Sequence, residues 1–383
     1  MTWCFRAPWC ERIVSGPGCT RAHLGNLIAE LAAERVLVIT GTTLASRADV
    51  LDHVLAPLAG REVSVFSATL QHSPRATVLA AADALRAARA QCVISFGGGT
   101  PIDTAKLAAM CVAGDVRSPE QLDALHLRFP AGGEPIYPRV PEVTLPHIAI
   151  PTTLSGGEHT DLAGSVDPVT RHKHVYACPG SAPRFILLDP ELAAATPDRL
   201  WASTGMRALD HAIEGYCSVR PQPINDALAV AAARRLFAHL AGRDRDAREA
   251  CLIAASQSIM CASRNVPMGL SHSLARQLGG RYGVPHGLAA ALTLPAVLAF
   301  NAAANGARQR ELARELGSDA PLADTVRELA RSLGVHTRLR DWDVPRDDLP
   351  GLAEDAMSDW GVVTNPRRVA HASEIVALLE TMY

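Results

Sequence analysis

The sequence predicts an α/β half with a parallel sheet, followed by an all-α half. Short apolar segments alternate with helical segments over the first 190 residues, a pattern typical of a doubly wound sheet. From residue 191 onward the apolar residues recur at helical spacing, and no further convincing strand is found. With 383 residues, 48% of them hydrophobic, the chain is long enough for two cores. We therefore expect one domain over residues 1–190 and a helical domain over residues 191–383.

The predicted strands of the first half follow one another at regular intervals. Residues 35–41 form a continuous apolar run, which is typical of a strand buried on both faces of a parallel sheet. Residues 113–145 are rich in proline and glycine and are expected to form a loop or lid. Strands are expected within residues 11–18, 35–41, 62–66, 92–96, 147–150 and 185–190, and helices within 21–34, 47–58 and 75–90.

Composition narrows the classes of partner. The net charge is -2 and the pI is about 6.7, so no basic field suggests binding to nucleic acid or membrane surfaces. No stretch reaches the roughly 18 consecutive apolar residues of a membrane span, and no signal peptide is recognised. Nine cysteines without a CxxC pair indicate reduced thiols. We expect a cytoplasmic protein whose partners are small molecules.

Three glycines follow the strand at residues 92–96 and open the next helix. Residues 97–100 are Gly-Gly-Gly-Thr, and Asp103 lies one turn further on. Glycines at the carboxyl end of a strand let backbone N–H groups approach a phosphate, and the helix N-terminus adds a partial positive charge. We expect an anion cradle suited to a pyrophosphate; a plain strand-to-helix turn is the alternative.

A second strand end carries hydroxyl groups and glycines. Thr152, Thr153 and Leu154 follow the strand at residues 147–150 and precede a glycine pair. The carboxyl ends of neighbouring strands border the crevice in which open α/β sheets bind ligands. The site is therefore expected between the two halves of the chain.

Residues 203–214, in the helical half, place ionisable side chains among apolar ones. The Ser-Thr pair at residues 203–204 is expected to cap a helix, on which Arg207 and His211, four residues apart, share one face. Three histidines on separate segments could bind a metal ion, although each alone is equally explained as a core residue. These histidines are His211, His272 and His286.

Taken together, the motifs resemble the iron-containing (group III) alcohol dehydrogenase superfamily, in particular its maleylacetate reductase branch. The resemblance covers nearly the whole chain and rests on residues 97–106, 151–158, 205–214 and 272–287. It implies a nucleotide-binding α/β domain and a helical catalytic domain in a dehydroquinate synthase-like fold, and it implies a homodimer. It also implies NAD or NADP, held at the pyrophosphate by Gly97, Gly98, Gly99, Thr100 and Asp103, along the adenine and ribose by Thr152, Thr153 and Leu154, and at a ribose by Lys173.

Blander roles stay open for some of these residues. The two threonines could satisfy loop backbone groups, and Lys173 could be a solvated surface charge. The strand at residues 35–41 ends without the carboxylate that many NAD-preferring members use to bind the ribose hydroxyls, so NADPH should be tolerated.

The metal position departs from the family pattern. In metal-dependent members the ligands are an aspartate and three histidines; the histidines match, but the aspartate position is Arg207. A guanidinium has no lone pair for a metal and repels a divalent ion, so metal binding is doubtful. Arg276 occupies a position where many members have another histidine. If a metal bound, Glu214 could approach it only through a shifted helix, and Asp210 lies off the shared face.

The resemblance and this departure together predict the function. We expect NAD(P)H-dependent reduction of a carbonyl or conjugated keto acid such as maleylacetate, with an anionic substrate held by Arg207 and Arg276. His272 or His286 is expected to donate the proton. Structural pairing of Arg207 with Asp210 or Glu214 is the blander interpretation. The alternatives for the whole chain are an iron- or zinc-dependent alcohol dehydrogenase, a dehydroquinate synthase-like lyase and a silent nucleotide-binding relative.

Overall fold

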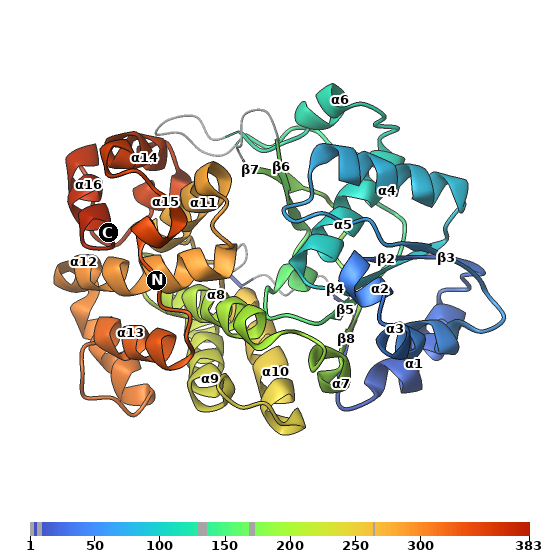
Figure 1. Ribbon diagram of the computed structural model, residues 1–383, viewed down its shortest axis with the longest axis horizontal. Coiled ribbons are helices and arrows are strands. Elements are labelled where there is room, and N and C mark those ends of the chain that lie inside the picture. Colours follow the sequence, from blue (N-terminus) through green and yellow to red (C-terminus); the bar gives the residue numbers. More distant parts are fainter. Residues whose placement is uncertain (1–3, 6–9, 129–135, 168–172, 263–264) are drawn as a thin grey trace.

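The computed structural model describes residues 4–5, 10–128, 136–167, 173–262 and 265–383. Its first half contains the strands, and after β8 the described residues form helices and loops (Figure 1). The strands are β1 (Arg12–Ser15), β2 (Arg35–Thr40), β3 (Glu62–Phe66), β4 (Cys92–Gly97), β5 (His147–Pro151), β6 (Leu162–Val166), β7 (Lys173–Ala177) and β8 (Phe185–Leu188). The predicted α/β-plus-helical fold class is confirmed.

Helices accompany the strands in the first half and fill the second. In the first half they are α1 (Cys19–Glu30), α2 (Thr42–Ala45), α3 (Ala48–Leu55), η1 (Ala56–Leu58), α4 (Arg75–Ala87), α5 (Gly99–Ala113), α6 (Pro119–Asp123), η2 (Gly157–His159) and α7 (Pro190–Ala193). In the second half they are α8 (Asp198–Tyr216), α9 (Pro223–His239), α10 (Arg245–Ala262), α11 (Leu270–Tyr282), α12 (His286–Glu315), α13 (Leu322–Ser332), η3 (Leu339–Trp342), η4 (Arg346–Asp348), α14 (Leu349–Met357), α15 (Trp360–Val363) and α16 (Ala372–Glu380).

Six parallel strands form the main sheet, in the order β1-β8-β5-β4-β2-β3. Successive residues of β2 face opposite layers: Val36 and Val38 pack with α1 and α3, while Leu37 and Ile39 pack with α4 and α5 (Figure 1). Both faces of the sheet are thus covered, which explains why β2 is apolar throughout.

The chain order reverses around β2, and this places the site. The strands β3 and β4 lie on opposite sides of β2, so the carboxyl ends of β2 and β4 border a topological switch point. Thr40 pairs with Phe96, and Gly97 pairs with Pro151 at the end of β5. The glycine segment therefore lies between two other strand ends, as expected of a ligand site.

A two-stranded antiparallel hairpin, β6–β7, was not predicted. It packs on α5 through two side chains that are one helical turn apart. The Asp103 carboxylate accepts the Gly164 N–H at 3.2 Å, and the fully buried Lys106 ammonium donates to the Leu162 carbonyl at 2.9 Å and to the Gly157 carbonyl. The hairpin thus depends on polar tertiary contacts, which local hydrophobic periodicity does not report.

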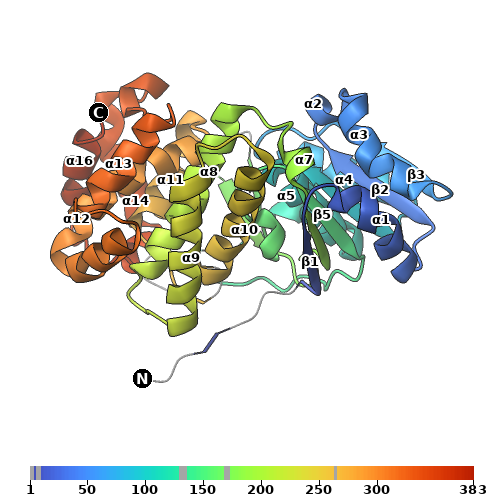
Figure 2. The ribbon, with the colours of Figure 1, turned by 90° about the horizontal axis from the view of Figure 1, so that it is seen from below.

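The helical half is built around α8, which packs against α9, α10 and α12 (Figure 2). The expected helix start at residues 203–204 is wrong, because α8 already begins at Asp198 after Pro197. The Ser203 and Thr204 hydroxyls instead donate back to the Leu200 carbonyl at 3.0 and 2.9 Å. An acidic residue in the first turn suits the positive end of the helix dipole, which explains the earlier start.

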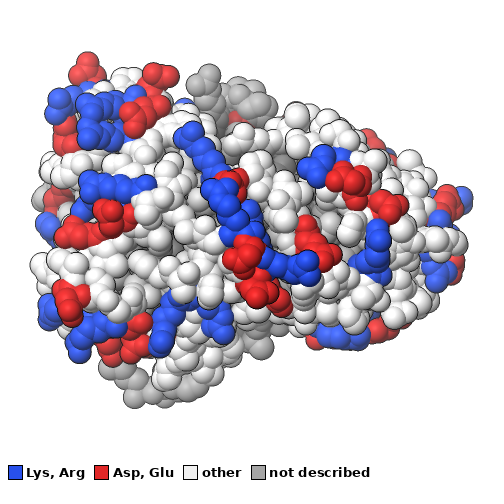
Figure 3. All heavy atoms as spheres, turned by 60° about the horizontal axis from the view of Figure 1, so that its bottom comes forward, with Lys and Arg blue, Asp and Glu red and all other residues white. Residues whose placement is uncertain are grey.

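One helix, α12, is long and apolar enough to cross a membrane by length and composition alone, among the described residues. Of its most apolar window, 67% is buried inside the protein, which is typical of a core helix. On the surface drawn in Figure 3, Lys and Arg side chains lie next to Asp and Glu side chains. No single-sign field covers that face.

Candidate active site

The glycine segment forms a tight turn at the end of β4. Gly97 has a φ of 136°, which side-chain-bearing residues rarely adopt, and α5 begins two residues later. A Cβ added at Gly98 would lie 3.1 Å from Thr153 Cγ2, and one at Gly99 would lie 3.2 Å from Ser155 Oγ. No side chain in the described part of the chain caps this helix N-terminus, so its first N–H groups can bind an anion.

The segment after β5 joins the glycine turn to the helical half. The Thr152 N–H donates to the Gly97 carbonyl at 2.9 Å, which holds the two strand ends together. The Leu154 N–H donates to the Thr204 hydroxyl on α8 at 3.2 Å, and the Leu154 side chain lies in the helical core. The structure therefore brings the predicted cofactor residues to the junction with α8.

Three further residues were predicted to bind the cofactor: Thr100, Asp103 and Lys173. Thr100 is in the first turn of α5. The Asp103 carboxylate supports the hairpin through Gly164, so it positions the neighbouring chain. Lys173 begins β7 opposite Val166, but its side chain lies outside the described part of the structure.

Four ionisable side chains of α8 form the centre of the candidate site. Arg207, Asp210, His211 and Glu214 are all at most 8% exposed. Arg207 Nη1 donates to Asp210 Oδ2 at 2.7 Å, so the structural pairing considered above is present. Burial lowers the pKa of Arg207, and the charges of Asp210 and Glu214 oppose that shift. We call these four residues together with His272 the Arg207 cluster.

Glu214 binds the N-terminus of α11, a role that the sequence did not reveal. Its carboxylate accepts the N–H groups of Gly269 at 3.0 Å and Ser271 at 2.9 Å. It also contacts His272 Nδ1 at 2.7 Å. Burial raises the pKa of Glu214, whereas the backbone donors favour its ionised form. When the Glu214 carboxylate is ionised it accepts this proton, so that His272 carries its proton on Nδ1 and a lone pair on Nε2.

The two central histidines are neutral and incompletely bonded. Burial, reinforced by the Arg207 charge, lowers the pKa of His272 to about 3 and that of His211 well below its ordinary value. Their ring centroids are 5.0 Å apart. Among the described groups, His272 Nε2, His211 Nδ1 and Asp210 Oδ1 are buried without a hydrogen-bond partner. Such atoms also occur elsewhere in the described chain, but here three of them gather in one cluster with perturbed pKa values, which favours a ligand site.

The third histidine lies at the start of α12, beside α8. His286 is partly exposed, and a Cβ at the next residue, Gly287, would lie 2.2 Å from the Ser203 carbonyl oxygen. The two helices are therefore in close contact one turn before Arg207. Within the described chain, the ligand atoms that gather here within 4.8 Å of one another belong to Asp210, Glu214 and His272. The three predicted histidines do not form such a group.

Arg276, on α11, is directed to another partner. Its Nη2 donates to Asp359 Oδ1 at 2.5 Å, and the same carboxylate caps α15 by accepting the Gly361 N–H at 2.8 Å. Burial is the main cause of the lowered pKa values of Arg207 and His272, and the Arg276 charge adds to both shifts. The Arg276 charge therefore acts on groups of the candidate site. Arg276 therefore adds positive potential while anchoring α15.

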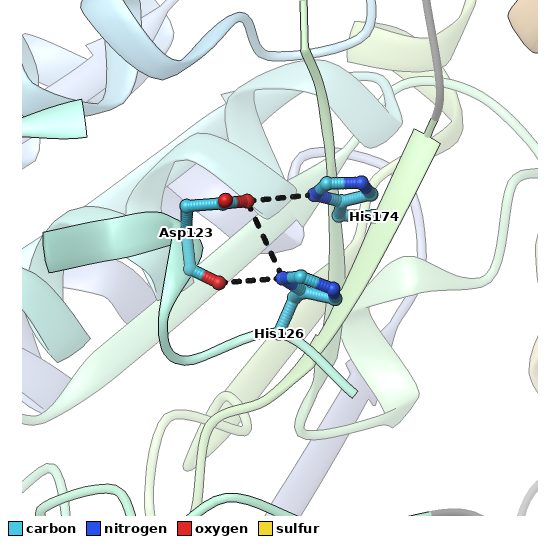
Figure 4. Close-up of side chains that lie close together, drawn as sticks. All are labelled: Asp123, His126 and His174. Carbon is cyan, nitrogen blue, oxygen red and sulfur yellow. Dashed lines mark hydrogen bonds and ion pairs between the residues drawn. The ribbon is translucent and has the colours of Figure 1, made fainter. Parts of the chain in front are cut away.

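A second group of ionisable side chains lies in the α/β half. Figure 4 shows Asp123, at the end of α6, directed at His126 and at His174 of β7. Asp123 Oδ1 lies 3.1 Å from His174 Nδ1 and 3.4 Å from His126 Nδ1. Arg75 Nη2 contacts Asp123 Oδ1 at 2.5 Å and His174 Nδ1 at 2.9 Å, and Arg75 Nη1 lies 3.4 Å from Asp167. We call these five residues the Arg75 cluster. The Arg75 guanidinium contacts Asp123 and His174, two of the three residues here whose atoms could bind a metal ion, so it already supplies a positive charge at this position.

Comparison with known families matches both halves of the chain. Residues 10–190 match the iron-containing alcohol dehydrogenase family, and residues 201–383 match the C-terminal part of the Fe-containing alcohol dehydrogenase family. Lactaldehyde reductase of Escherichia coli (strain K12) is 33% identical over 305 residues, which cover 76% of each chain.

Solved structures agree with this match over almost the whole length. Sulfoacetaldehyde reductase from Bifidobacterium kashiwanohense, in complex with NAD+, superposes with a TM-score of 0.87 at 25% identity, covering 100% of this chain and 99% of that one. Maleylacetate reductase from Rhizobium sp. strain MTP-10005 superposes with a TM-score of 0.80 at 26% identity, covering 100% and 98%.

Proposed function

Because the chain belongs to the iron-containing alcohol dehydrogenase family, we propose that it reduces an anionic carbonyl compound, a keto acid such as maleylacetate, without a metal ion. The chain is an oxidoreductase acting on CH–OH groups, which interconverts an alcohol and the corresponding carbonyl compound. The observation that carries the proposal is the buried guanidinium of Arg207 at the position where metal-dependent members carry an aspartate ligand.

The residues present do not fit the family's metal ion. Arg207 Nη1 already contacts Asp210, and the Glu214 carboxylate is engaged by backbone N–H groups of α11 and by His272. Burial lowers the pKa of both His211 and His272, and the Arg207 charge lowers it further. The same positive field opposes a divalent cation at these nitrogens.

The glycine turn does fit a nicotinamide dinucleotide. Gly97, Gly98 and Gly99 allow this turn to pack closely against Pro101, Thr153 and Ser155, and the turn leads into an uncapped helix N-terminus that can bind a pyrophosphate. The similar sulfoacetaldehyde reductase is solved with NAD+. The end of β2 carries Thr40 and Thr42 and no carboxylate, so a 2′-phosphate would meet no repulsion there. When bound, the reduced cofactor supplies the hydride.

The side chains of the Arg207 cluster can polarise and orient the substrate. The Arg207 N–H groups not used by Asp210 can bind a carbonyl oxygen and stabilise the negative charge that develops on it. His272 offers a lone pair at Nε2, so at neutral pH it accepts a hydrogen bond there and does not donate a proton. Of the two predicted donors, this geometry favours His286, which is partly exposed and can exchange protons with solvent.

Metal-dependent alcohol oxidation is the second candidate function. It is favoured by one observation, the ligand atoms of Asp210, Glu214 and His272 within 4.8 Å of one another. Such a site would need Arg207 to leave Asp210. The proposed metal-free reduction is therefore compatible with the Arg207–Asp210 ion pair, whereas metal-dependent alcohol oxidation requires that this pair be broken.

Steady-state oxidation of NADH and NADPH tests the proposal with matched substrates. Each keto acid is compared with its methyl ester and with a neutral aldehyde of similar size. We expect the free acid to be preferred by about tenfold or more in kcat/KM, because only the acid carries the charge that Arg207 and Arg276 attract. Equal kcat/KM for acid and ester would contradict an anionic substrate.

A further inference from the structure

A pocket of about 660 Å³ lies in the helical half, away from the Arg207 cluster. It is bordered by α12, α13, α16 and residues 336–338, at the end of the molecule opposite the sheet (Figures 1 and 2). Its described lining includes neither the glycine turn nor any residue of the Arg207 cluster. This volume falls in the range of small-molecule sites.

The floor of the pocket is an apolar strip of α12. Leu292, Pro295 and Phe300 form it, with alanines between them. The Arg367 guanidinium stacks on the Phe300 ring at 3.9 Å from its centroid and donates to Glu374 at 3.2 Å. One end of the pocket is thus flat, aromatic and nearly balanced in charge.

The other end has an excess of positive charge. Arg327, Arg331 and Arg338 border it, and Arg327 is already paired with Asp324. The acidic side chain in the described lining is Glu374, which pairs with Arg367. Arg331 lies 3.7 Å from Glu328, with side chains 57% and 73% exposed, so this pair contributes little. The Arg338 guanidinium forms no ion pair with a described carboxylate, although the Arg338 backbone N–H donates to Asp341 Oδ2 at 2.8 Å.

His336 also lines this part of the pocket. Burial lowers the pKa of His336, the charges of Arg331, Arg338 and Arg327 lower it further, and the Asp341 charge opposes the shift. Arg331 and Arg338 are therefore the guanidinium groups that remain for an anion at the mouth of the pocket. An anion entering there would be attracted by both.

We propose that this pocket binds a small organic anion, with a carboxylate or phosphate head at Arg331 and Arg338 and a flat apolar body on the α12 floor beside Phe300. Arginines recognise both kinds of head group through paired N–H donors. The floor supplies apolar surface that an inorganic anion cannot use. The ligand would contact α12, the helix that begins with His286, and the site is separate from that of the proposed reduction.

Binding to the full chain tests the site with defined probes. Isothermal titration compares 3-phenylpropionate, phenyl phosphate, 3-phenylpropionamide and inorganic phosphate. We expect both organic anions to bind at least about tenfold more tightly than the neutral amide and than inorganic phosphate. The preferred head group then identifies the source of the ligand as a carboxylate or a phosphate ester.

Variants assign the binding to this pocket. The double variant R331Q/R338Q should weaken binding of the organic anion by about tenfold or more, and Ala299→Trp, which adds bulk to the exposed lining of α12, should weaken it for steric reasons. Arg340→Gln, an exposed arginine outside the lining, is the matched control and should bind as the wild type does.

Three results would overturn the proposal. They are no binding of either organic anion at millimolar concentration, equal binding of the amide, and unchanged affinity in both pocket variants. Circular dichroism and thermal unfolding show whether each variant is folded. Since turnover of the keto acid does not depend on this pocket, failure here would leave the proposed reduction untouched.

Discussion

Two arginines of this chain are surrounded by the same kinds of side chain, two carboxylates and two histidines, yet the surroundings differ in one respect. In the Arg75 cluster the side chain of Asp123 is 42% exposed and those of His126 and His174 are 20% exposed. In the Arg207 cluster the side chains of Arg207, Asp210, Glu214 and His272 are at most 10% exposed. Three acceptor or imidazole atoms of this cluster are left without a partner among the described groups.

The difference separates a structural ion cluster from a reactive one. The Arg75 cluster joins α4, α6 and β7, and its only unpartnered buried atom in the described structure is Arg75 Nε. The Arg207 cluster is desolvated and leaves Asp210 Oδ1, His211 Nδ1 and His272 Nε2 for a ligand. Burial without full hydrogen bonding reduces stability, so it persists where function needs it.

The largest expected effect is on catalysis. Replacing Arg207 by Gln removes the charge that stabilises the developing oxyanion, and we expect kcat/KM for a keto acid to fall by about 10²–10³-fold. Arg75→Gln is the matched variant and should leave kcat/KM within about twofold. Steady-state kinetics of both purified variants decides; a similar loss in both would erase the distinction between the clusters.

The next effect tests how Glu214 positions His272. Glu214→Gln keeps the shape but offers the α11 N-terminus and His272 Nδ1 one neutral oxygen in place of a carboxylate. We expect kcat to fall by about tenfold to 10²-fold, with a change in its pH profile because the His272 proton is no longer held on Nδ1. An unchanged profile with reduced thermal stability would assign Glu214 a purely structural role.

Arg75→Gln should show its effect in stability. Removing the guanidinium breaks its ion pairs with Asp123, whose side chain is 42% exposed, and with Asp167, whose side chain is 10% exposed. We expect the free energy of unfolding to fall by about 1–3 kcal/mol, measured by guanidinium denaturation. Arg47→Gln, whose pair with Asp49 is exposed, is the control and should leave the free energy of unfolding nearly unchanged. Equal losses would mean that the Arg75 cluster contributes no more than a surface pair.

The smallest effect is the pH dependence of stability. His272 has a pKa of about 3 in the folded protein, below that of an unfolded histidine, so between these values the unfolded state binds more protons. Stability is therefore lost as pH falls below about 6.5. Comparing wild type with His272→Gln at pH 6.5 and pH 5 cancels other titrations, and the variant should lose about 2 kcal/mol less.

His174 provides the contrasting case for the same measurement. Burial lowers its pKa as well, but it is only partly enclosed and Asp123 and Asp167 oppose the shift. His174→Gln should therefore change the acid dependence less than His272→Gln does. A larger effect at His174 would contradict the view that the Arg207 cluster is the more desolvated one.

What the sequence predicted depended on local patterns. The apolar run of β2 and the glycines after β4 have local causes, strand burial and a positive φ, so both were predicted. Doubtful metal binding was predicted because Arg207 stands where metal-dependent members of the family have an aspartate ligand, and this requires only the residue type at one position. In contrast, the binding of Glu214 to α11 joins residues 55 or more positions apart, and the buried Lys106 donates to carbonyls of η2 and β6. No periodicity signals such tertiary hydrogen bonds.

The measurement that tests the central idea most directly is turnover of a keto acid after removal of metals. Protein purified anaerobically is analysed for iron and zinc by mass spectrometry, treated with a chelator, and assayed with NADH and NADPH. If Arg207 replaces the metal, we expect far less than one ion per chain and unchanged kcat/KM after chelation. One iron or zinc per chain, with activity lost on chelation and restored by the metal, would contradict the account.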